Sequence, residues 1–227
     1  MKLHLKKEEF TDAIRATASH FNIREIFVEK DYWVTFVLKN LHASKYAYSV
    51  VFKGGTSLSK AYNMAERFSE DIALAIVRAS NQTQDECDGL IHLVEAAIAI
   101  SPLAKHESLG FTSKNKKFMQ SHWDYPRRSL GLHDPVKDKI MLEITSSANT
   151  TPNDRMKISS LIGEFLSKTK QKSLIEEFEL AAFEIQVLSH RRTFAEKVVA
   201  VTNACFADQD LTRMKEKIRH LYDLTLL

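Results

Sequence analysis

Two glycines, two hydroxyls and an acid lie close together in the sequence and could bind a phosphate and a metal ion. Gly54, Gly55, Thr56 and Ser57 follow one apolar run, and Asp71 opens the next. Glycines let the backbone approach an anion closely, and a helix that begins there presents free N–H groups to it. A carboxylate on the adjacent strand could hold Mg²⁺, which prefers one or two carboxylates plus phosphate oxygens. These residues therefore predict in-line displacement at a phosphoryl group, assisted by magnesium.

Residue 73 is the position where such a metal site would need its second carboxylate. Side chains two residues apart on a strand point to the same face of a sheet, so residue 73 shares a face with Asp71. Residue 73 is Ala, whose methyl group cannot bind a metal ion. A purely structural alternative is that the glycines form only a tight turn and that Asp71 is a strand-edge acid. An acid opening a buried strand is uncommon without a functional reason, which favours the site.

The segments around this stretch predict an α+β protein with a small mixed sheet, flanking helices and a helical C-terminal part. Apolar residues three and four apart predict helices, and short apolar runs between turn residues predict a sheet of about five strands, with 183–189 as a last short candidate. The polar stretch 146–157 contains a proline and predicts a loop. Expected helices are 7–20, 24–41, 56–63, 83–100, 158–169 and two after residue 191; expected strands are 48–55, 71–77, 107–114, 117–126, 138–147 and 183–189.

The composition is typical of a globular protein and offers no sign of a membrane span or a cysteine-based metal site. The chain has 227 residues, 44% hydrophobic and 27% charged, with a net charge of +3, so bulk charge alone does not require a nucleic-acid partner. No apolar run approaches the roughly 20 residues that span a bilayer, so we expect a cytoplasmic protein without a membrane partner. Cys87 and Cys205 match no metal or redox spacing. We expect a core over 1–150 and a mainly helical part over 151–227, with natural chain continuing past the final apolar helix.

Five short motifs, in this order along the chain, resemble a known family. They are "FVEKDYWV", "FKGGTSLSKAY", "RFSEDIAL", "RRTFAEKVVAV" and "RHLYDL". Together they resemble the AbiEii-type nucleotidyltransferase toxins of the polymerase-β-like superfamily, in which an Asp-x-Asp pair, commonly "RFSEDIDL", follows the glycine turn. The resemblance implies Mg²⁺-dependent transfer of a nucleoside monophosphate from an NTP to an acceptor, which for some relatives is tRNA. It also implies a toxin of a toxin–antitoxin or abortive-infection system, with a cognate antitoxin as partner.

The resemblance also implies roles for individual residues. Asp71 would be the first metal carboxylate, Lys197 would approach the triphosphate, and Asp223 would be a further active-site acid. Ala73 replaces the second carboxylate, either as an engineered inactivating substitution, which we favour because the other motifs are intact, or in a natural pseudoenzyme. The residues that would face the nucleotide are Gly54, Gly55, Thr56, Ser57, Lys60 and Ser69.

Three of the candidates also have ordinary structural interpretations. The resemblance implies a third carboxylate from a further strand, so Glu143 is either that residue, acting as a metal ligand or as a base for the incoming hydroxyl, or a solvated strand residue. Lys197 could be a solvated helix lysine, and Asp223 could pair with Arg219 one helical turn away. The acidic and basic residues at 29–31 are expected to brace the site rather than to take part in catalysis.

Basic residues in the middle of the chain could contact RNA phosphates. Trp123 and Tyr125 lie between two of these clusters and either stack on unpaired bases or pack in the core. Two further functions remain open: a small-molecule nucleotidyltransferase of the antibiotic-modifying kind, and a catalytically inactive module that binds nucleotide or RNA. The basic residues are Lys114, Lys116, Lys117, Arg127, Arg128, Lys137, Lys139, Arg155 and Lys157.

Overall fold

A seven-stranded mixed sheet forms the centre of the protein in the computed structural model, which describes residues 1–64, 71–129, 139–207, 214–215 and 217–226. The strand order is β3-β4-β5-β2-β1-β7-β6, in which β5 runs parallel to β2 and β7 parallel to β1, and the remaining neighbours are antiparallel. The strands are β1 (Val50–Lys53), β2 (Asp71–Ile76), β3 (Ala104–Thr112), β4 (Phe118–Asp124), β5 (Lys139–Thr145), β6 (Asn153–Ile158) and β7 (Phe183–Leu188).

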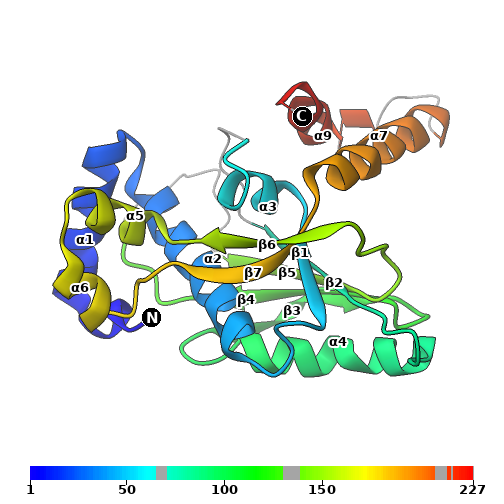
Figure 1. Ribbon diagram of the computed structural model, residues 1–227, viewed down its shortest axis with the longest axis horizontal. Helices are drawn as coiled ribbons and strands as arrows, with labels where there is room; N and C mark the ends of the chain where they lie inside the picture. The colour runs from blue at the N-terminus through cyan, green and yellow to red at the C-terminus, as the bar shows by residue number, and fades with distance from the viewer. Residues whose placement is uncertain (65–70, 130–138, 208–213, 216, 227) are drawn as a thin grey trace.

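Helices gather at both ends of this sheet and along one of its faces. Figure 1 shows α1, α5 and α6 together at one end of the molecule, and α7 and α9 together at the opposite end. The helical elements are a short 3₁₀ turn (Leu3–Leu5), α1 (Lys7–Phe21), α2 (Glu25–Ala43), α3 (Gly55–Lys60), α4 (Gln84–Ile98), α5 (Leu161–Lys168), α6 (Lys172–Glu177), α7 (His190–Ala207) and α9 (Ile218–Leu226).

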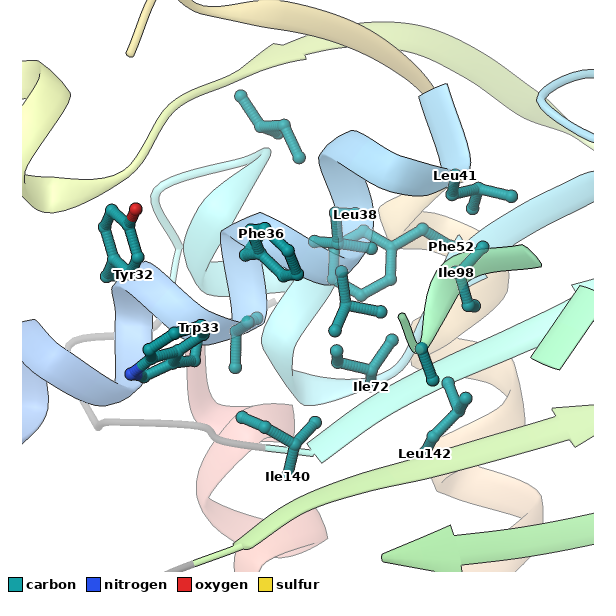
Figure 2. Packing of buried hydrophobic residues seen from close by; sticks show 14 of the residues in the cluster. Tyr32, Trp33, Phe36, Leu38, Leu41, Phe52, Ile72, Ile98, Ile140 and Leu142 are labelled. Atoms are coloured by element: carbon teal, nitrogen blue, oxygen red, sulfur yellow. The ribbon is translucent and has the colours of Figure 1, made fainter. Parts of the chain in front are cut away.

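Helix α2 is the centre of the hydrophobic core, because almost every one of its residues from Ile26 to Leu38 is buried. Figure 2 shows Trp33, Phe36 and Leu38 of this helix in the same cluster of buried side chains as the strand residues Ile72 and Leu142. In β4 and β5 buried residues alternate strictly with half-buried ones, as expected for strands with one face on a core. The alternate residues therefore line the opposite, more polar face of the sheet.

The predicted α+β class, the mixed sheet and the helical C-terminal part are confirmed. The prediction of a loop over 146–157 is wrong, because residues 153–158 form β6 and pair with β7. This strand lies at the edge of the sheet and most of its side chains are exposed, so it lacks the apolar alternation that identifies a strand. Strands from both sides of the predicted division at residue 150 share one sheet; the division itself stays a prediction.

Two further observations concern the cysteines and the hydrophobicity of the helices. Cys87 is buried and Cys205 is exposed, and both are free thiols. Within the described ranges, none of the helices combines the length and the apolar character that crossing a membrane requires.

Candidate active site

Asp71, residue 73 and Glu143 lie on one face of the sheet, on two adjacent parallel strands. The register places Asp71 beside Met141, and Ala73 beside Glu143. Leu142 is buried in the core, so Glu143 points to the same face as Asp71. Both strands bring their acids to this face through simple alternation, and Ala73 occupies the place between them.

The glycine turn lies directly against residue 73. Gly54 has φ +85°, a conformation that residues with side chains rarely adopt. A Cβ atom on Gly54 would lie 3.4 Å from the Cβ of Ala73, so the turn and residue 73 are neighbours in space. A longer side chain at residue 73 would therefore extend alongside the turn that was predicted to bind phosphate.

The two predicted hydroxyls hold the turn itself. Thr56 Oγ1 donates to the backbone oxygen of Asp71 at 2.5 Å, which ties the start of α3 to the start of β2. Ser57 Oγ donates to the backbone oxygen of Gly54 at 2.8 Å. Both side chains are buried. In this arrangement the groups best suited to meet a phosphate are the backbone N–H groups at the start of α3.

Lys60, the last residue of α3, has protein partners for its ammonium. Its ammonium contacts Asp31 Oδ1 at 2.5 Å and the backbone oxygen of Ser159 at 3.0 Å. Asp31 also accepts a hydrogen bond from the backbone N–H of Leu161 at 2.7 Å, at the start of α5. Burial raises the pKa of the adjacent Glu164 carboxyl, and the charge of Asp31 adds to this effect. Ser69, another predicted nucleotide-binding residue, lies outside the described residues, as do Lys137 and most of the "RFSED" segment.

Lys197 and Asp223 form a buried ion pair. Lys197 Nζ lies 2.7 Å from Asp223 Oδ2, and the two side chains are 8% and 0% exposed. Lys197 comes from α7 and Asp223 from α9, so the pair joins the two C-terminal helices. The interpretation of Lys197 as a solvated helix lysine is therefore wrong, and Asp223 has Lys197 as a partner rather than only a neighbour along its own helix.

A second ion pair, which the sequence did not indicate, joins α7 to the sheet. Lys53 Nζ lies 2.6 Å from Glu196 Oε2. Lys53 is the cross-strand neighbour of Ala73, so it lies on the same face as the carboxylates. In the sequence, only the position of Lys53 directly before the glycine pair indicates that this lysine lies near the site.

The acidic and basic residues of α2 brace the structure, as predicted. The fully buried Glu29 accepts hydrogen bonds from the backbone N–H groups of Arg128 and Ser129 at 2.6 and 2.7 Å, and from the Ser129 hydroxyl at 2.5 Å. The ammonium of Lys30, also fully buried, donates to the backbone oxygen of Lys139, the first residue of β5. These neighbours on α2 thus hold the chain after β4 and the chain at the start of β5.

Replacing Glu29 with Ala should lower the free energy of unfolding by about 3 to 5 kcal/mol, because it leaves three buried or half-buried donors without their acceptor. Urea unfolding followed by circular dichroism measures this loss. Glu29→Gln serves as the matched variant, since its amide oxygen still accepts one hydrogen bond and should recover part of the stability. An alanine variant within 1 kcal/mol of the parent, roughly the scatter of surface substitutions, would show that the bracing role is wrong.

The prediction that Trp123 and Tyr125 stack on bases is wrong, and the alternative of core packing is confirmed. Both side chains are buried, and Tyr125 packs against Trp33 with ring centroids 5.8 Å apart. The indole N–H of Trp123 donates to Ser121 Oγ at 2.9 Å. Alternation on β4 directs Trp123 into the core, and Tyr125, the residue after the strand, keeps the same direction.

The basic clusters do not form one surface. Lys114, Lys116 and Lys117 follow the end of β3, at one edge of the sheet, whereas Arg155 and Lys157 belong to β6 at the other edge. Arg127 and Arg128 follow β4 and are half-buried. Any RNA contact would therefore involve separate parts of the surface.

The donor set on the sheet face suits one magnesium ion better than two. Asp71 and Glu143 provide the hard oxygen ligands that Mg²⁺ prefers. No group of three or more His, Cys, Asp or Glu residues is placed to hold a metal in the part of the chain that the structure describes. The residues present fit an ion that completes its shell with nucleotide phosphates and water, and residue 73 contributes no ligand.

Comparison with known proteins agrees with this geometry. The family model described as "Nucleotidyl transferase AbiEii toxin, Type IV TA system" matches residues 37–227. The chain belongs to the AbiEii nucleotidyltransferase toxin family. The match includes the glycine turn, Asp71, Glu143 and both members of the Lys197–Asp223 pair, so every described candidate lies inside the AbiEii region.

A solved structure shares the fold of this AbiEii chain. It is MenT4, a nucleotidyltransferase toxin from Mycobacterium tuberculosis H37Rv, with a TM-score of 0.56 at 18% sequence identity. The similarity covers 83% of this chain and 58% of the MenT4 chain, so it spans little more than half of that protein. No curated protein matches the sequence.

Proposed function

We propose that the chain is the nucleotidyltransferase of a toxin–antitoxin system, which transfers a nucleoside monophosphate from an NTP to an RNA acceptor such as tRNA. The observation that carries the proposal is the arrangement of Asp71, residue 73 and Glu143 on adjacent strands, beside the Gly54 turn. Membership of the AbiEii family supports the same activity and implies an antitoxin as partner.

Different residues would bind the triphosphate and the metal ion. The turn at Gly54 and the first turn of α3 would receive the triphosphate, since glycine permits a close approach and a helix start offers N–H donors. The acceptor hydroxyl would attack the α-phosphorus and release pyrophosphate. Asp71 and Glu143 would hold Mg²⁺, which neutralises charge on the phosphates when it is bound. Catalysis would rest mainly on positioning and electrostatics.

The role of Glu143 follows from its place in the register. It is the nearest acid on β5 to residue 73, and it is half-buried on the carboxylate face. It could serve as a metal ligand or accept the proton of the incoming hydroxyl. Lys197, held by Asp223, would provide the positive charge that faces the triphosphate.

This copy of the protein should have little or no activity, because Ala73 offers no ligand where the AbiEii motif has its second Asp. The apolar methyl group takes the place of one of the paired carboxylates. We favour a deliberate inactivating substitution, since the rest of the site is in place; the alternative is a natural pseudoenzyme that binds nucleotide or RNA without turnover.

Reversing the charge of Arg127 and Arg128 to Glu should weaken RNA binding, because these basic residues follow β4, the strand that pairs with β5. Each lost phosphate contact should also lower the dependence of log Kd on log salt by about one unit. Filter binding of cellular tRNA over a salt series measures both effects. Lys157→Glu, on the far edge of the sheet, is the matched control; an unchanged affinity of the double variant at low salt would remove this hypothesis.

A small-molecule acceptor is the second candidate, and acceptor choice separates the two. An Ala73→Asp variant should transfer label from an NTP to tRNA and not to an aminoglycoside, since the several basic clusters of the chain favour a polyanionic acceptor. Label on the aminoglycoside alone would favour the antibiotic-modifying alternative.

A further inference from the structure

The ion pair between Lys53 and Glu196 connects the carboxylate face to α7. Its two charged atoms are 2.6 Å apart, and its side chains are 17% and 26% exposed, so the pair is largely shielded from water. Lys53 is the last residue of β1 and the register neighbour of Ala73. The next residue is Gly54, which lies against Ala73. One end of the pair is therefore fixed at the centre of the candidate site.

The other end of the pair lies on a helix that has two different partners. Glu196 and Lys197 are consecutive in α7, so their side chains leave the helix about 100° apart. Glu196 contacts β1 through Lys53, whereas Lys197 contacts α9 through the buried Asp223. Rotation of α7 about its axis would break one contact or the other. The two pairs together determine which way Lys197 points.

Contacts from outside the C-terminal helices also hold the start of α7. The Tyr62 hydroxyl donates to the backbone oxygen of Leu188, and the Tyr62 ring packs on His190 at a centroid distance of 5.2 Å. These contacts lie more than one turn before Glu196. Arg192 approaches the same carboxylate at 3.8 Å, from within α7 itself. Among the ion pairs of the described residues, the one from Lys53 joins the sheet to the middle of this helix.

We propose that Lys53 and Glu196 are positioning residues that set the placement of α7, and so of Lys197, against the sheet face that carries Asp71. The effect on catalysis rests on the proposed function, whereas the effect on the placement of α7 does not. Lys53 acts through Glu196 and the helix, and needs no contact with the substrate. An Asp restored at residue 73 would lie beside Lys53, so the same lysine would also adjoin the second metal carboxylate.

Hydrogen exchange of α7, followed by mass spectrometry, tests the structural part in the protein as it stands. Lys53→Met and Glu196→Gln should each raise the exchange rate over residues 190–207 by up to about fivefold. The reversed pair, Lys53→Glu with Glu196→Lys, should restore protection. Lys105→Met removes a comparable strand-to-helix ion pair, at 2.9 Å to Glu95, and should leave α7 unchanged. Unchanged exchange in both single variants, or continued loss of protection in the reversed pair, would overturn the proposal.

The same substitutions in an Ala73→Asp background test the catalytic part. Each single variant should lower kcat by up to about 100-fold with a smaller change in KM, because misplacement of a catalytic group affects the reaction more than binding. The reversed pair should recover most of kcat. Raised exchange with unchanged kcat would overturn the positioning role. If the Ala73→Asp protein transfers nothing at all, the proposed function fails, and the exchange comparison still decides whether Lys53 holds α7.

Discussion

Replacing Ala73 with Asp should convert a protein that its host tolerates into one that arrests growth. The substitution restores a carboxylate beside Glu143, on the face that carries Asp71, and next to the Gly54 turn. Two carboxylates and the phosphates of a nucleotide complete the oxygen shell that Mg²⁺ needs. Residue 73 is half-buried, so the new side chain has access to solvent without unfolding the strand. Growth after induction, compared between parent and variant, is the measurement.

Ala73→Asn is the matched control for this prediction. Its side chain has nearly the shape of Asp but lacks the charge, so it should leave growth normal. Thermal unfolding offers a second readout: Mg²⁺ with NTP should raise the Tm of the Ala73→Asp protein more than that of the Asn variant, because only the native state binds the ion. Normal growth of the host with a folded, soluble Asp variant would contradict the proposed toxin.

Breaking the Lys197–Asp223 pair should have the largest effect on stability of any single change in the C-terminal helices. Asp223→Ala leaves the buried ammonium of Lys197 without its carboxylate, and loss of one partner of a buried pair typically costs about 3 to 5 kcal/mol. Lys197→Met should cost a similar amount, since it leaves the fully buried carboxylate of Asp223. Urea unfolding of the two single variants gives these values.

The double variant Lys197→Met with Asp223→Leu separates stability from function. Replacing both charges with apolar groups should cost much less than the sum of the single changes, because no charge is then left buried alone. In an Ala73→Asp background the double variant should nevertheless be inactive, since the positive charge that we propose for the triphosphate would be gone. A stable double variant with full activity would show that the pair is structural only.

The carboxylate face could be predicted from the sequence because it depends on local periodicity. Two-residue alternation placed residues 71 and 73 on one face, and placed Glu143 opposite the buried Leu142. The register that brings Ala73 beside Glu143 is a property of the sheet, and the sequence offered it only through the family resemblance.

Features that depend on tertiary contacts could not be predicted from the sequence. The partner of Asp223 lies on another helix, and nothing in the spacing of either residue indicates it. Lys60 is expected near the nucleotide, and the sequence did not indicate that its ammonium pairs with Asp31 on α2. β6 was missed because an exposed edge strand needs no apolar alternation to pair with β7.

Label transfer by the Ala73→Asp protein tests the central claim most directly. The protein is incubated with Mg²⁺, cellular tRNA and each of the four NTPs, labelled in turn at the α- and at the γ-phosphate, with Ala73→Asn as control. The account predicts that α-label enters RNA from at least one NTP, that γ-label leaves as pyrophosphate, and that the Asn variant transfers neither. Absence of α-label from RNA with all four NTPs, or entry of γ-label instead, would contradict a nucleotidyltransferase that acts on RNA.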